Sequence, residues 1–164
     1  MFNRIFPKQF DNNYRGHWLA IWFLVPIVLG RLAMGANSII NTRLVAASAD
    51  GIPLDRYNAG AAAAVVALFA LAGLFNLLFA LQGAVVLIRY RAMIPFMYLL
   101  LLIQGLGSKA LLLAHPVIRS GVPTAALGSA FVLALLAMTL IGFVLSLLNK
   151  SDVLPQPQAD SASR

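Results

Sequence analysis

The sequence predicts an all-α membrane protein, an up-and-down four-helix transmembrane bundle with both termini in the cytoplasm. Of its 164 residues, 61% are hydrophobic and only 10% are charged, and the mean hydropathy is +0.87. Soluble domains carry about 25% charged residues. The apolar residues form four continuous runs, each long enough for the ~20 residues of a membrane-spanning helix. Because such runs lack the alternation of barrel strands, they exclude a β-barrel.

The four apolar runs define the expected helices. We expect these helices at about residues 18–40, 59–88, 92–114 and 123–148. The third and fourth runs open with Pro95 and Pro123 near their first turns, where the missing N–H is harmless. The link Arg89-Tyr90-Arg91 is so short that the second and third helices must be antiparallel neighbours, and the up-and-down topology follows.

Residues 18–149 therefore form one transmembrane domain with two different flanks. Residues 1–17 are a basic and aromatic segment, with Phe or Tyr at steps of four residues, which is typical of a cytoplasmic or interfacial anchor. Residues 150–164 are rich in Pro, Gln, Ser and Asp, so we expect a disordered cytoplasmic tail.

Lys and Arg counts fix the expected orientation. One side collects Arg4, Lys8, Arg15, Arg89, Arg91, Lys150 and Arg164, and the other collects Arg43, Arg56 and Arg119. The excess of basic residues places both termini in the cytoplasm. The first helix is read as an uncleaved anchor, because Arg31 interrupts its apolar run where a signal peptide should be cleanest. The alanine-rich composition indicates a bacterial cytoplasmic (inner) membrane.

Several classes of chemistry are excluded by composition. The chain has no cysteine and no glutamate, and all five aspartates lie outside the apolar runs. These facts exclude thiolate chemistry and weaken any proton-coupled transporter. The two histidines, His17 and His115, belong to opposite faces of the bilayer, about 30 Å apart. We expect no catalytic residues, no metal site and no cofactor, and we assign the formal charge of +7 to anionic lipids rather than to nucleic acid.

Three polar residues share one depth in the membrane. Arg31 is thirteen residues beyond Trp18, and Asn76 and Gln104 are each thirteen residues from the Arg89-Tyr90-Arg91 link. At 1.5 Å per residue, all three lie about 20 Å from the cytoplasmic interface. One hypothesis is a ligand-binding pocket, in which Arg31 supplies positive charge and the two amides orient a headgroup, quinone or other amphipathic ligand. The alternative is a purely structural network that fixes helix register, with Arg31 extending towards the outer interface.

An arginine near mid-membrane costs at least about 2.5 kcal/mol, so Arg31 needs compensation from its surroundings. Pro26 should kink its helix five residues earlier, which favours a small cavity. Lys109 lies near the outer end of its helix, and we expect it to reach the interface on the side of Asp50 and Asp55. Helix contacts are expected where small residues repeat every four positions, at Ala126, Ala130 and Ala134, at Gly60 with Ala64, and at Ala63 with Ala67.

Two functions are compatible with these patterns. The first is a non-catalytic accessory or scaffold subunit of a membrane complex, with an unidentified membrane protein partner or a second copy of the chain. The second is a membrane ligand-binding or transport component with a polar pocket around Arg31, Asn76 and Gln104. Membrane lipids are expected partners in both.

Overall fold

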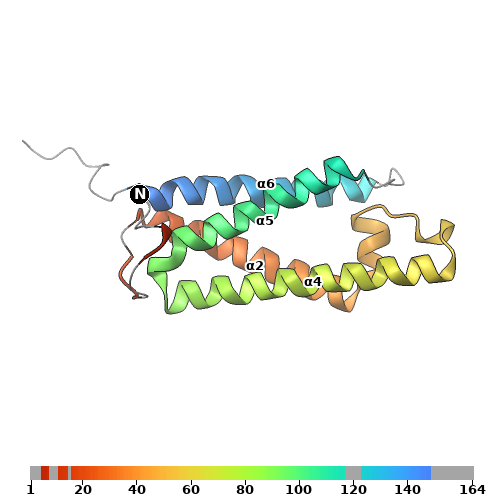
Figure 1. Cartoon of the computed structure of the whole chain (residues 1–164), viewed down its shortest axis with the longest axis horizontal. Coiled ribbons are helices and arrows are strands. Elements are labelled where there is room, and N and C mark those ends of the chain that lie inside the picture. The colour runs from red at the N-terminus through yellow and green to blue at the C-terminus, as the bar shows by residue number, and fades with distance from the viewer. Residues whose placement is uncertain (1–4, 8–10, 15, 117–122, 149–164) are drawn as a thin grey trace, which may run out of the picture.

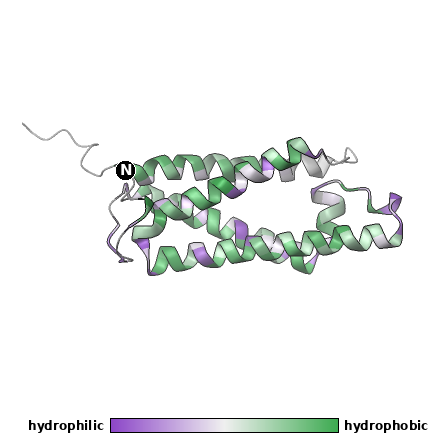
Figure 2. Cartoon of the chain, in the orientation of Figure 1, coloured by the Kyte–Doolittle hydropathy of each residue, from purple (hydrophilic) through white to green (hydrophobic). Residues whose placement is uncertain are grey.

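The computed structural model describes residues 5–7, 11–14, 16–116 and 123–148, and all regular structure in these residues is helical. The long helices are α2 (Leu19–Ile40), α4 (Ala59–Ile88), α5 (Ile94–Ala114) and α6 (Pro123–Leu147) (Figure 1). Each begins and ends within two residues of an apolar run in the sequence. All four helices are long and apolar enough to cross a membrane. Figure 2 shows polar residues mainly at the helix ends, with isolated exceptions near mid-length.

Successive long helices alternate in direction (Figure 1). The start of α2 and the end of α6 meet where the His17 N–H donates to the Leu145 carbonyl at 3.3 Å. The link between α4 and α5 lies at this same end, because the Ala92 N–H donates to the Asp11 carbonyl at 3.3 Å. We call this the terminal end of the bundle and the opposite one the loop end.

Helix packing is uneven around the bundle. α2 makes its most extensive contact with α4 and packs also on α6, whereas α5 packs mainly on α6. The 3-10 turn η3 (Arg91–Met93) joins α4 to α5, and from there the two helices diverge towards the loop end (Figure 1). The expected pairing of these two helices is therefore limited to the terminal end.

The connection from Asn41 to Asn58 folds back onto the bundle at the loop end. It contains α3 (Thr42–Leu44), the π-helix η1 (Val45–Ala49) and the 3-10 turn η2 (Leu54–Arg56). Gly51 has a φ of 68° and turns the chain after Asp50. The buried residues of this connection pack on one face of α4; Ala46, Ile52 and Leu54 lie against Val65, Val66 and Phe69. The Asn58 side chain then caps α4 by accepting from the Ala61 N–H at 2.8 Å.

The main core occupies the terminal half of the bundle. Its buried residues come from the first half of α2, the second half of α4 and the first half of α5; they are Ala20, Leu24, Ile27, Val28, Ala80, Val86, Ile94, Met97, Tyr98 and Leu101. The Tyr98 hydroxyl donates to the Ala20 carbonyl at 2.6 Å and so ties α5 to α2. The loop half of the bundle has no comparable core among the described residues, and it contains Arg31.

Glycines make the closest helix contacts. A Cβ added to Gly35 of α2 would lie 2.8 Å from the Gly73 carbonyl oxygen of α4, and one on Gly142 of α6 would overlap the Tyr98 ring. The small residues expected to form contacts are instead exposed; these are Gly60, Ala63, Ala64, Ala67, Ala130 and Ala134. The side chain of Ala126 lies outside the described residues. The expected contacts are therefore wrong for these residues. Nearly every face of these helices carries small apolar residues, so their spacing does not show which face is buried.

Candidate functional site

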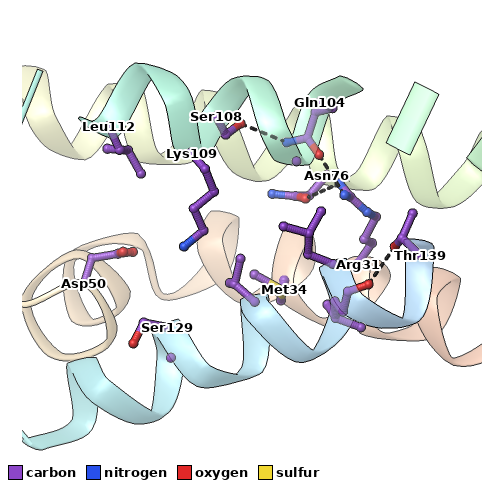
Figure 3. Close-up of a pocket in the computed structure, with 15 residues that line it drawn as sticks. Arg31, Met34, Asp50, Asn76, Gln104, Ser108, Lys109, Leu112, Ser129 and Thr139 are labelled. Atoms are coloured by element: carbon purple, nitrogen blue, oxygen red, sulfur yellow. Dashed lines mark hydrogen bonds between the residues drawn. The ribbon is translucent and has the colours of Figure 1, made fainter. Parts of the chain in front are cut away.

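Arg31 lies at the centre of a polar network between three helices. Its Nη1 donates to the Asn76 Oδ1 at 3.1 Å, and its Nη2 donates to the Gln104 Oε1 at 2.7 Å (Figure 3). The three residues come from α2, α4 and α5, and their equal depth was the basis for expecting them to meet. Arg31 therefore points into the bundle and does not extend along its own helix towards the outer interface.

Close helix packing holds the network in place. The contact between Gly35 and Gly73 lies one helical turn from the hydrogen bond between Arg31 and Asn76, so α2 and α4 approach most closely beside it. The Asn76 Nδ2 donates to the Ala72 carbonyl at 3.2 Å, which orients the amide oxygen towards Arg31. The Gln104 Nε2 donates to the Ser108 hydroxyl at 3.4 Å along α5. Both amide oxygens are thus presented to the guanidinium.

The Arg31 guanidinium is solvated but not neutralised by these contacts. A guanidinium has five N–H donors, and Arg31 donates two hydrogen bonds to neutral amide oxygens. The Nε atom is buried and has no hydrogen-bond partner among the described residues. The Phe79 ring, whose centroid lies 5.6 Å from the Arg31 Cζ, adds a cation–π contact. The positive charge remains without a carboxylate partner within the part of the chain described.

A cavity of about 210 Å³ opens beside the guanidinium on the loop-end side. Further polar side chains from α5, α6 and the Asn41–Asn58 connection line it together with Arg31, Asn76 and Gln104; these are Asp50, Ser108, Lys109, Ser129 and Thr139. Apolar residues of α5 and α6, such as Leu112 and Leu136, complete the wall. Figure 3 shows Lys109 extending from α5 into the cavity on the side of Asp50. The cavity therefore extends from the Arg31 guanidinium, near the middle of α2, to the charged side chains of Lys109 and Asp50 towards the loop end.

The formal charges that line this cavity do not cancel. Among the described lining residues, Arg31 and Lys109 are cationic and Asp50 is the single carboxylate. This described part of the wall therefore carries a formal net charge of +1. Hydroxyl and amide groups around it can both donate and accept hydrogen bonds. Chemically, the cavity suits a small group that carries one negative charge and several acceptor oxygens.

The sequence identified three of these residues and the side towards which a fourth extends. Arg31, Asn76 and Gln104 were expected together, and the hydrogen bonds between them are confirmed. Lys109 extends on the side of Asp50, as expected, but its position in the wall of the cavity was not foreseen. The spacing of Gln104 and Ser108, one turn apart on α5, was a usable signal that this face is polar. The position of Asp50 depends on how the Asn41–Asn58 connection folds back, which no local pattern encodes.

Within the described residues there is no group of three His, Asp or Glu side chains that could hold a metal ion. Comparison with protein-family models, with curated proteins and with solved structures gave no match. The functional interpretation therefore depends on the site itself.

Proposed function

We propose that this protein is a non-catalytic, multi-pass membrane protein that binds the anionic group of an amphipathic ligand in the cavity beside Arg31. The observation that carries the proposal is a guanidinium at mid-helix whose hydrogen-bond acceptors are neutral and whose buried Nε donor has no partner among the residues that the structure describes. A buried cation normally has an anionic partner, because neutral hydrogen bonds offset only part of its desolvation. A ligand anion supplies that partner here.

The dimensions and lining of the cavity support an amphipathic ligand. Drug-sized ligands occupy pockets of about 300–1,000 Å³, so a cavity of about 210 Å³ holds a headgroup-sized fragment only. The remainder of the ligand must lie outside it, and the surfaces of α4 and α5 around the cavity are apolar (Figure 2). A polar fragment inside and an apolar fragment outside describe an amphiphile.

The test is native mass spectrometry of the protein purified in a neutral detergent, beside thermal unfolding of the same sample. We expect wild type to retain a small anionic molecule and Arg31→Leu to lose it. Folding should survive in the variant, with a stability change of about 1 kcal/mol, because Asn76 and Gln104 can still pair with each other. The proposal fails if wild type carries no small molecule, or if the variant carries the same molecule equally well.

Arg43→Leu is the matched control. Arg43 is exposed in α3 and does not line the cavity, so the variant removes the same charge without touching the site. Loss of ligand from both variants would assign retention to overall charge instead of to Arg31.

A second candidate is an accessory or scaffold subunit of a membrane complex. The observation that favours it is the exposure of small residues on α4 and α6; these are Gly60, Ala63, Ala67, Ala130 and Ala134. Such faces allow close packing by a helix of another protein. Copurification separates the candidates, because a scaffold retains a stoichiometric protein partner and a binding protein retains a small molecule.

We further propose that both termini lie in the cytoplasm and that the membrane is a bacterial inner membrane. Arg89 and Arg91 lie at the terminal end of the bundle, and Arg43 and Arg56 lie at the loop end, so the proposed orientation depends on the basic residues of the terminal segments as well. Because the chain has no cysteine, single cysteines report cleanly. An impermeant reagent added to intact cells should label Ser48→Cys and Ser120→Cys but not Tyr90→Cys or Ser161→Cys, and the opposite pattern would invert the orientation.

A further inference from the structure

The seam between α4 and α5 changes character along its length. At the terminal end it is closed, since Val86 of α4 and Met97 of α5 are only 7% and 2% exposed, and the Met97 methyl lies 3.6 Å from the position of a Cβ on Gly83. Towards the loop end, Leu68 of α4 and Leu111 of α5 are each 64% exposed. The axes of the two helices diverge towards the loop end (Figure 1), and we call the exposed apolar faces that carry Leu68 and Leu111 the groove.

The open part of this groove is continuous with the cavity. Gln104, Gly107, Ser108 and Leu111 share one face of α5, since they are spaced by three, four and seven residues. Gln104 reaches Arg31 from this face, whereas Ser108 lines the cavity and is exposed. A Cβ on Gly107 would meet no other atom within 4 Å. The face of α5 that carries the exposed Leu111 thus also carries Ser108 and Gln104, which line the cavity.

We propose that the ligand of the Arg31 cavity is a lipid with a monoanionic phosphodiester headgroup, whose acyl chain lies in the groove between α4 and α5. This inference depends on the proposed anion-binding function and specifies its ligand. The net charge of +1 on the cavity wall matches one phosphodiester charge, and a diphosphate would leave charge unpaired. The headgroup fits the cavity volume, and the exposed apolar residues of the groove contact the chain.

Lateral access follows from the same geometry. A lipid in the bilayer reaches the groove sideways, with its headgroup passing Ser108 and Lys109 before it meets Arg31 (Figure 3). Lys109 and Arg31 then contact the phosphate from two helices. Hydroxyl groups of the headgroup have Ser108, Ser129 and Thr139 within the same wall as hydrogen-bonding partners.

The experiment measures binding to the delipidated, detergent-purified protein by thermal shift and native mass spectrometry. The probes are phosphatidylglycerol, phosphatidylcholine and soluble glycerol 3-phosphate. We expect phosphatidylglycerol to raise the Tm and to appear as a bound adduct, and we expect the other two probes to do neither at equal concentration. Arg31→Leu and Lys109→Gln should weaken the binding of phosphatidylglycerol.

Two tryptophan variants of α5 test the groove. Gly107→Trp fills open space on the groove face, and Leu113→Trp places the same ring on the opposite face, where Leu113 is 83% exposed. We expect Gly107→Trp to weaken phosphatidylglycerol binding about tenfold, which corresponds to about 1.4 kcal/mol, and Leu113→Trp to bind as wild type does. Equal binding by the two variants overturns the groove assignment.

These outcomes also distinguish a failure of the lipid assignment from a failure of the proposed anion-binding function. If glycerol 3-phosphate stabilises wild type as well as the lipid does, and Arg31→Leu abolishes the effect, the cavity binds anions but the lipid assignment is wrong. If phosphatidylcholine binds as tightly as phosphatidylglycerol, the charge match is wrong. If no probe gives a stabilisation that depends on Arg31, both proposals fail.

Discussion

The two halves of the bundle satisfy their polar groups in different ways. In the terminal half, buried hydroxyls donate to main-chain carbonyls, as Tyr98 does to Ala20 at 2.6 Å and Ser146 does to Phe143 at 2.6 Å. In the loop half, the buried Thr42 hydroxyl also donates to a main-chain carbonyl, that of Ile39 at 2.9 Å. Arg31, however, donates to side-chain amides and keeps a buried Nε without a partner in the described residues. A hydroxyl has one O–H donor, and each of these bonds satisfies it. The Arg31 guanidinium has five N–H donors, and its Nε–H has no acceptor among the described residues. The two halves thus differ in whether their buried donors are satisfied among the described residues.

Packing also differs between the two halves, and it is closer in the terminal half than in the loop half. Gly142 in the terminal half contacts the Tyr98 ring so closely that no side chain fits, whereas Gly107 in the loop half faces open space. Dense packing leaves the terminal half no room to change shape. The loop half instead has a cavity of about 210 Å³ beside Arg31.

The largest expected effect comes from Gly142→Leu. The new side chain overlaps the Tyr98 ring and forces α5 and α6 apart, and overpacking of this kind costs about 3 kcal/mol or more. Gly107→Leu is the matched control, and it should be neutral or slightly stabilising because leucine has the higher helix propensity. Denaturation midpoints in detergent, followed by circular dichroism, compare the two. Equal midpoints would contradict the assignment of dense packing to the terminal half.

The contrast between the halves shows what the sequence could predict. Helix positions follow from composition, since apolar runs end at polar or proline residues such as Asn58 and Pro123. The meeting of Arg31, Asn76 and Gln104 follows from depth, because the rise per residue places antiparallel helices on a common scale. Neither result requires knowledge of which helix faces touch.

The faces themselves could not be predicted. Helices that are apolar all round carry no periodic signal for their buried side, so the contacts of Gly35 with Gly73 and of Gly142 with Tyr98 were missed. The position of Lys109 in the cavity and the widening of the seam between α4 and α5 depend on helix rotation and tilt. Asp50 reaches the cavity only through the folding of the Asn41–Asn58 connection. Whether the cavity holds a ligand stays a prediction.

The second largest loss in the free energy of unfolding is expected from Asn76→Leu. This change removes one acceptor from Arg31 and leaves the buried cation less well solvated, so we expect a loss of about 1 to 2 kcal/mol in the free energy of unfolding. In Arg31→Leu/Asn76→Leu the charge is absent, and the double variant should be more stable than Asn76→Leu alone. Unfolding curves of the four proteins in one double-mutant cycle measure this coupling. Strict additivity would show that the hydrogen bond contributes nothing.

Tyr98→Phe should have a smaller effect. The phenyl ring keeps its packing against Gly142, and only the hydrogen bond to the Ala20 carbonyl is lost. We expect a destabilisation of about 1 kcal/mol with ligand retention unchanged, because Tyr98 does not line the cavity. Thermal unfolding and native mass spectrometry of one preparation measure both quantities. Loss of the ligand in this variant would show that the two halves are coupled.

Ser108→Ala is expected to change stability least and still to report on the site. Ser108 is exposed, and its hydroxyl accepts a long hydrogen bond of 3.4 Å from Gln104, so its removal should alter the free energy of unfolding by less than about 0.5 kcal/mol. The same hydroxyl lies where the groove meets the cavity, and a headgroup passing there would lose a hydrogen-bonding partner. We therefore expect unchanged unfolding but weaker binding of phosphatidylglycerol, measured by thermal shift over a lipid titration. Thr139 is the contrasting position, because its hydroxyl already donates to the Leu135 carbonyl at 2.6 Å and Thr139→Val should lower stability as well. If Ser108→Ala lowers stability as much as Thr139→Val and leaves lipid binding intact, the loop half is structural in the same sense as the terminal half.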